Sequence, residues 1–130
     1  MGIKEGVRSI VINAPADAIK AIDAPSLDLH SRLSGNFFYI HLFVTDAERL
    51  QELFPKLKKH LAPTGMLWVS WPKGDRQSAG LTLPVIIKTG YDYGLVESKT
   101  LSVNSTWSAI KFTHPKQGKV YNNSYGRLKA

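Results

Sequence analysis

The chain has 130 residues, about the size of one ordinary domain, and 43% of its residues are hydrophobic while 21% are charged. That composition is typical of a globular protein, and no apolar run approaches the roughly 20 residues that a helix needs to cross a bilayer. The sequence has no cysteine, which excludes disulfides and thiolate metal sites and favours a reducing compartment. Because its start, MGIKEG, also lacks the layout of a secretory signal, we expect a cytoplasmic protein without membrane contact.

The net charge of +7 is concentrated at the end of the chain. Residues 114–130 hold four of the 17 basic residues and no acid, which leaves 13 basic against 10 acidic residues in the first 113. We therefore expect a single α/β domain over residues 1–113 and a basic polar tail over residues 114–130. The tail, with Tyr121 and Tyr125 among its cations, either contacts nucleic acid or is a solvated terminus that folding does not require.

Four elements are expected in the first third of the chain. Residues 7–13 form a β-branched apolar run typical of a buried strand, and residues 15–22 are typical of a short helix with a proline in its first turn. Residues 26–33 predict a second, weaker strand. Residues 37–44, FFYIHLFV, are apolar on both alternating faces, which predicts a strand in mid-sheet with helices on either side.

A helix is expected over residues 45–61. Thr45 and Glu48 have the spacing of a capping box, acidic residues come early and lysines late, and leucines keep one face apolar. Pro55 lies inside this span and predicts a kink or a break into two helices.

The remaining elements complete an α/β pattern. We expect a strand at residues 65–70, a helix at 81–94, where the pattern would also suit a strand, and two strands around a polar turn near Ser105. The order β-α-β-β-α-β-α-β-β implies a mostly parallel sheet with helices on both faces and an antiparallel hairpin at the end.

Two groups of motifs resemble known proteins. The segment HLFVTDAERLQELFPKLKKHLAPTGMLWVSWPK, followed by GLVESKTLSVNSTWSAIKF, resembles the second half of a class I methyltransferase domain. More narrowly, GIKEGVRSIVINAP, LWVSWPK and TWSAIKF resemble a short bacterial family of domains of unknown function. The resemblance covers residues 2–113 and implies a Rossmann-like, methyltransferase-like fold.

The turn after the first strand departs from that resemblance. Methyltransferases that use S-adenosylmethionine have a glycine-rich turn there, as dinucleotide-binding folds do, because missing side chains let the cofactor approach the backbone. The equivalent turn here holds Asn13, Ala14 and Pro15, and Asp28 is the only acid near the end of the second strand. We therefore expect no bound cofactor and no methyltransferase activity.

Other catalytic motifs are absent from the sequence. It has no P-loop, no G-x-S-x-G elbow and no H-E-x-x-H, and its four histidines lack metal-ligand spacing, so no metal is expected. His41, on a buried strand, is either a hydrogen-bonded core residue or a catalytic base. Ser70 is a candidate nucleophile only if a base reaches it.

The carboxyl edge of the sheet is the expected ligand site, because ligands bind there in this architecture. The turn after the first strand, the tip of the fourth strand and the final hairpin turn should meet at this edge. We expect Trp107 to approach Trp71 or Pro72 and to form one wall of a cleft, or else the two tryptophans simply cap the core. The candidate ligand-binding residues are Asn13, Pro15, Ser70, Trp71, Pro72, Lys73, Arg76, Asn104 and Trp107.

Two functions are consistent with these features. The first is a non-catalytic module that binds a small ligand, such as an anion, or a protein partner at the carboxyl edge. The second is an enzyme for a small anionic substrate, with Lys73 as electrostatic clamp and His41 or Ser70 performing the chemistry. Nucleic-acid binding through the basic tail is a more distant alternative.

Overall fold

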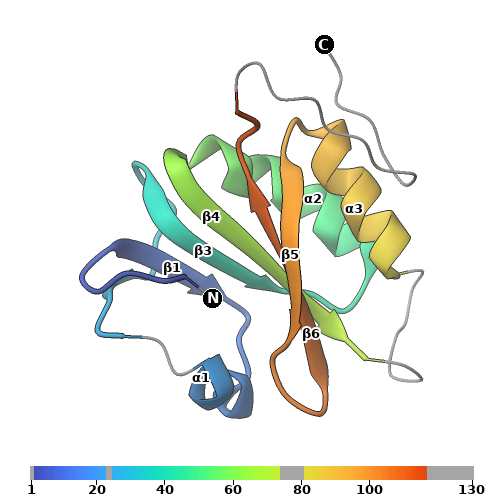
Figure 1. Cartoon of the computed structure of the whole chain (residues 1–130), viewed down its shortest axis with the longest axis horizontal. Helices are drawn as coiled ribbons and strands as arrows, with labels where there is room; N and C mark the ends of the chain where they lie inside the picture. The colour runs from blue at the N-terminus through green and yellow to red at the C-terminus, as the bar shows by residue number, and fades with distance from the viewer. Residues whose placement is uncertain (1, 23–24, 74–80, 117–130) are drawn as a thin grey trace.

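Six strands form one sheet in the order β2-β1-β3-β4-β6-β5 (Figure 1). In this computed structural model the described residues are 2–22, 25–73 and 81–116. The strands are β1 (Arg8–Ile12), β2 (Asp28–His30), β3 (Phe37–Phe43), β4 (Leu61–Pro72), β5 (Val96–Ser102) and β6 (Trp107–Thr113). The neighbours β2-β1-β3-β4 are parallel, whereas β6 runs antiparallel between β4 and β5. The predicted mostly parallel sheet with a terminal antiparallel hairpin is confirmed.

Three helices flank the sheet: α1 (Ala16–Ile22), α2 (Ala47–Lys59) and α3 (Leu83–Asp92). Figure 1 shows α2 and α3 together on one side, while α1 lies apart from them at the bottom of the view, beside the β5–β6 turn. Helices therefore cover both faces, as expected, but in the described part of the chain the second face has one short helix, of two turns. Among the described residues, no helix is long and apolar enough to span a membrane.

Two features of α2 differ from the sequence-based expectation. Its N-cap is Asp46, whose carboxylate accepts a hydrogen bond from the Arg49 amide at 2.7 Å, so the predicted capping box is wrong. A carboxylate three residues before that amide satisfies an otherwise unpaired donor of the first turn. The helix also continues through Pro55 to Lys59 as one element, so the predicted break into two helices is wrong. Buried Leu50, Phe54 and Leu57 hold both halves against the sheet.

The two faces of the sheet have cores of very different size. The larger core lies between the sheet and the helices α2 and α3, and it includes Ile40, Leu42, Phe54, Tyr91 and Phe112. The smaller one, on the other face, centres on the buried residues Tyr39, Trp68 and Ala109. The second face is thus the thinly covered side of the molecule.

Parallel strands bring several chain reversals to one edge of the sheet. The carboxyl ends of β1, β3 and β4 lie there, and the β5–β6 turn joins them because β6 starts at this edge. From β1 the chain crosses to β2 on one side, whereas from β3 it crosses to β4 on the other. Such a switch in direction is where open α/β sheets bind ligands.

Candidate functional site

Trp107 lies at the carboxyl edge, directly opposite Pro72 in the β4–β6 pair. The predicted approach of Trp107 to the tip of the fourth strand is therefore confirmed. Its ring also meets that of Phe43 edge to face, with centroids 5.2 Å apart. Trp71, however, packs in the larger core at 5% exposure, so the two tryptophans lie on opposite faces of the sheet. They cannot form one wall together.

Lys73 is held by the hairpin that it faces. Its amide donates to the Thr106 carbonyl at 2.8 Å, and its ammonium donates to the Ser102 hydroxyl. These contacts fasten the end of β4 to the β5–β6 turn. Of the predicted site residues, Arg76 lies outside the described part of the chain.

Asn104 closes the β5–β6 turn and ties it to α1. Its Oδ1 accepts from the amides of Thr106 and Trp107, both at 2.9 Å, while its Nδ2 donates to Asp17 Oδ2 at 3.3 Å. All three of its side-chain bonds are therefore within the fold. Asn104 positions α1 against the hairpin, a contact between residues far apart in sequence.

The turn between β1 and α1 is built without glycine. Asn13 adopts a φ of 60°, the left-handed region that glycine usually occupies, and asparagine tolerates it better than most residues. Pro15 begins the helix: its carbonyl accepts from the amides of Ala18 and Ile19, each at 3.1 Å. Asn13 and Pro15 thus have clear roles in shaping the turn.

These residues do not fit S-adenosylmethionine, which the fold would otherwise suggest. The turn keeps the side chains of Asn13, Ala14 and Pro15 where backbone approach is needed, and Pro15 has no amide to donate. In the register of β2 against β1, Asp28 lies opposite Arg8, at the start of β1 and away from the turn that follows this strand. It is therefore too far along the strand to bind a ribose at the carboxyl edge.

A buried polar chain, which the sequence did not reveal, runs across β3 and β4. Tyr39 Oη lies 2.5 Å from His41 Nδ1, and His41 Nε2 lies 2.6 Å from Ser70 Oγ. Both His41 and Ser70 are fully buried, and Phe43 stacks on the imidazole at 4.4 Å between ring centroids. Burial lowers the pKa of His41 to about 3 and raises the pKa of Tyr39, so both groups are neutral near pH 7.

The pairing of His41 with Ser70 answers the question of a base near Ser70. An imidazole in hydrogen-bond contact with a hydroxyl is the arrangement that activates a serine nucleophile. Here neither residue has exposed surface, and neither lines the hollows formed by the described residues beside Met66, α1 or Leu101. The hydrogen bonds among Tyr39, His41 and Ser70 instead satisfy buried polar groups that would otherwise be unpaired.

A groove on the second face is the main hollow beside α1. It has a volume of about 630 Å³, and Tyr39 and Val11 form its floor on the sheet. Two of its residues are large and exposed, Ile19 at 54% and Leu29 at 62%. The full lining is Val11, Ile19, Lys20, Ile22, Pro25, Ser26, Leu27, Leu29 and Tyr39.

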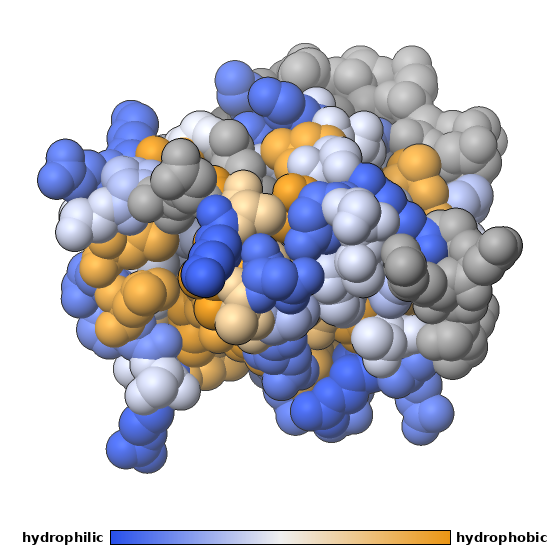
Figure 2. Space-filling model, turned by 90° about the horizontal axis from the view of Figure 1, so that it is seen from below, coloured by the Kyte–Doolittle hydropathy of each residue, from blue (hydrophilic) through white to orange (hydrophobic). Residues whose placement is uncertain are grey.

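This groove is mostly apolar. Among the described residues that line it, Lys20 is the only ionisable side chain apart from Tyr39, and Lys20 has no ion-pair partner in the described part of the chain. Figure 2 shows hydrophobic surface gathered on the side where Figure 1 draws β1 and α1. The sequence signal for this groove was weak. It consisted of Leu27 and Leu29, which alternate in the weak strand, and of the apolar Ile19 in the short helix. A smaller hollow of about 180 Å³ adjoins Ile22 and Leu101.

Metal binding has no support in the described ranges. No three histidine or acidic side chains there gather closely enough to hold an ion.

Comparison with known proteins gives the fold alone. No protein-family model matches the sequence, and no curated protein matches it either. Among solved structures, a ribosomal protein L11 methylase from Lactobacillus delbrueckii subsp. bulgaricus is similar, with a TM-score of 0.61 and 14% identity over 88% of this chain and 73% of that one.

Two further methyltransferase structures are similar to the same extent. Magnesium protoporphyrin IX methyltransferase from Synechocystis, with bound SAH, has a TM-score of 0.58 and 11% identity over 85% of this chain and 75% of that one. The N-methyltransferase NodS from Bradyrhizobium japonicum WM9 has a TM-score of 0.57 and 14% identity over 86% of this chain and 88% of that one. The chain therefore has a methyltransferase-like fold, as the sequence motifs implied.

Proposed function

We propose that this chain is a non-catalytic binding module. Its ligand would be a small anion with an apolar body, held in the groove beside α1. The observation that carries the proposal is the groove itself, an apolar hollow of about 630 Å³ with one lysine at its wall. Its size falls in the range of ligand sites in proteins, which are about 300–1,000 Å³ and mostly apolar. Lys20 would supply the charge contact, in place of the Lys73 that the sequence suggested.

The case against catalysis rests on two features of the carboxyl edge. The β1–α1 turn lacks the backbone access that the cofactor of similar folds requires, and His41 and Ser70 are sealed within the sheet. The alternative of an enzyme for a small anionic substrate has the His41–Ser70 bond in its favour, but both of these residues are fully buried. Membership of the bacterial family of unknown function and a cytoplasmic location stay predictions.

The groove can be tested with the fluorescent apolar anion 8-anilinonaphthalene-1-sulfonate. We expect saturable binding to the folded protein that Leu29→Ser weakens roughly tenfold, because covering the exposed part of one leucine contributes about 1–2 kcal/mol. Phe38→Ser is the matched control, since Phe38 is also exposed, at 45%, but does not line this groove. Binding that is not saturable, or that both variants weaken equally, would contradict the proposed site.

S-adenosylmethionine is expected not to bind at cellular concentrations. The physical reason is the β1–α1 turn, where Pro15 lacks an amide and no glycine permits close approach of the cofactor. Isothermal titration calorimetry checks this, with the cofactor in the syringe and the full chain in the cell. A saturable isotherm with low-micromolar affinity would show that the turn accepts the cofactor after all.

A further inference from the structure

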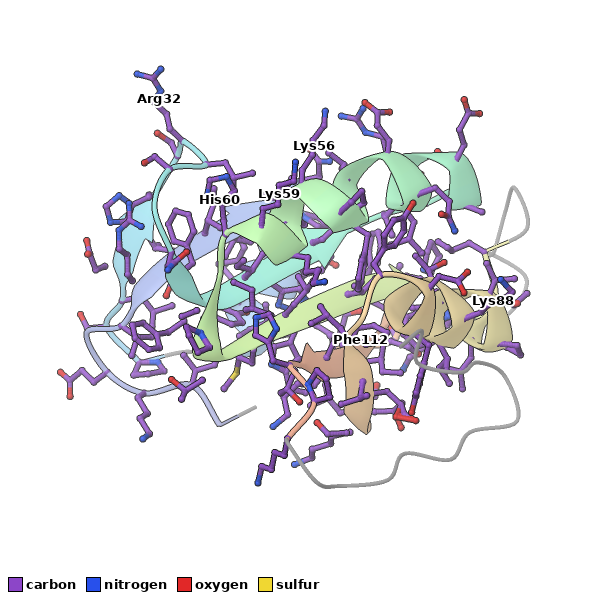
Figure 3. All side chains as sticks on the ribbon, turned by 90° about the horizontal axis from the view of Figure 1, so that it is seen from above. Arg32, Lys56, Lys59, His60, Lys88 and Phe112 are labelled. Carbon is purple, nitrogen blue, oxygen red and sulfur yellow. The ribbon has the colours of Figure 1, made fainter. Side chains whose placement is uncertain are left out.

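Several basic side chains lie toward the amino edge of the sheet. Lys56 and Lys59 lie in the last turn of α2, His60 caps that helix, and Arg32 comes from the loop between β2 and β3. Figure 3 shows the four side chains along one margin of the molecule. We call Arg32, Lys56 and Lys59 the amino-edge cation surface.

Hydrogen bonds hold the loop that carries Arg32 beside the end of α2. His60 Nδ1 donates to the Gly35 carbonyl at 2.6 Å, and on the other side of the loop Arg8 donates to the Asn36 carbonyl at 2.8 Å. The loop is therefore fastened to both α2 and β1. The cations of this surface come from two segments that the fold, and not the sequence, brings together.

The acid nearest to Lys56 along α2 is already engaged. Glu52, one turn before Lys56, pairs with Arg49 at 3.3 Å. In the described part of the chain, the three long cations of the surface have no ion-pair partner. Their charge is thus available to an anion from outside.

Compensation of the helix dipole does not account for so much charge. The carboxyl end of a helix carries the equivalent of about half a negative elementary charge. The last turn of α2 holds three lysines, Lys56, Lys58 and Lys59, and Arg32 adds a fourth cation in the loop that His60 holds at the end of the helix. A net positive excess therefore remains at this edge.

The same edge is also where β6 delivers the end of the chain. β6 runs from Trp107 at the carboxyl edge to Thr113, and His114 Nε2 then donates to the Leu61 carbonyl at 3.2 Å, at the start of β4. The sequence from residue 114 onward has four basic residues and no acid. The sequence therefore stays positively charged beyond the end of β6. Residues 117–130 lie outside the described ranges.

We propose that the amino-edge cation surface binds the phosphate backbone of a nucleic acid without sequence preference. Evenly repeated phosphates suit several separate lysine and arginine side chains, and such contacts supply most of non-specific nucleic-acid binding. A membrane-binding surface would pair its cations with exposed apolar groups. The large exposed hydrophobics, Ile19, Leu29 and Phe38, instead line hollows on the second face. This inference is independent of the groove and its ligand.

Fluorescence anisotropy with a labelled single-stranded RNA of mixed sequence tests the proposal on the full chain. With about three phosphates neutralised, a fourfold rise in salt should weaken binding roughly 20-fold. The triple variant Arg32→Gln, Lys56→Gln, Lys59→Gln should bind at least tenfold more weakly and lose most of that salt dependence. The control, Lys4→Gln, Lys88→Gln, Lys99→Gln, removes the same formal charge from other exposed residues, although Lys88 also pairs with Asp92 at 2.7 Å, and it should keep most of the affinity.

Four results would overturn the proposal. The first is no binding at low salt, and the second is an equal loss in both triple variants, which would reflect total charge and not this surface. The third is tighter binding to phosphatidylserine vesicles, which would assign the surface to a membrane. Truncation after Lys116 separates the tail: if it abolishes binding while the Arg32, Lys56 and Lys59 variant binds normally, the tail and not the surface is responsible. Melting curves of all variants, whose changes are at exposed residues, verify that they are folded.

Discussion

Lowering the pH from 7 to 5 is expected to reduce the free energy of unfolding by roughly 2 kcal/mol through His41 alone. Burial lowers the pKa of His41 to about 3 in the folded protein, whereas an unfolded histidine titrates near 6.5. Between these two values the unfolded chain binds the extra proton and the folded chain does not. The stabilisation is therefore fully present above the unfolded value and is lost as the pH falls toward 3.

Urea denaturation at the two pH values measures this effect in the wild type and in two variants. His41→Gln removes the titrating group and should lose the corresponding part of the pH dependence, while the other histidines contribute equally to both proteins. Tyr39→Phe removes the hydrogen bond at 2.5 Å but keeps the imidazole buried, so its pH dependence should persist on a lower baseline. An unchanged pH dependence in His41→Gln would mean that His41 is accessible to protons in the native state.

Gly90→Ala should destabilise the fold by roughly 2 kcal/mol or more, with a fall in melting temperature of about 8 °C. Gly90 lies in α3 where the helix crosses Phe112 of β6, a ring that Figure 3 labels beside α3. A Cβ at this position would lie 2.6 Å from Phe112 Cδ1 and 2.8 Å from its Cζ, inside van der Waals contact. Phe112 is fully buried and packs edge to face on Phe54, so it has no space to retreat. The gain in helix propensity, about 1 kcal/mol, offsets only part of this cost.

A double-mutant cycle identifies the cause. In a Phe112→Leu background the smaller side chain leaves room for the added methyl group, so Gly90→Ala should cost less than about 1 kcal/mol there. An equal cost in both backgrounds would place the strain in the α3 backbone and not in the contact with β6. Thermal melts of the four proteins provide the comparison.

Local patterns in the sequence determined the order and type of the elements. The unbroken apolar run of β3 specified a strand covered on both sides, and the leucine spacing of α2 specified a helix with one buried face. These signals are short-range, because each depends on residues within a few positions of one another. With the preference for parallel crossovers they were sufficient for the sheet, its antiparallel hairpin and the meeting of Trp107 with Pro72.

Side-chain facing and register were decided by the tertiary structure. The β3–β4 register sets Ser70 opposite Phe43, which lies two residues after His41 on the same face of β3. The hydrogen bond between His41 and Ser70 therefore joins positions 29 residues apart that share no sequence motif. Strand alternation turns Trp71 to the larger core and Trp107 to the other face, which separates two residues that looked like one site. The groove lies beside a helix of only seven residues on the second face, and the amino-edge cations share one margin because the loop of Arg32 is bonded to the end of α2. Each of these depends on pairing between distant segments, which follows from the packing of the whole chain and not from any local pattern.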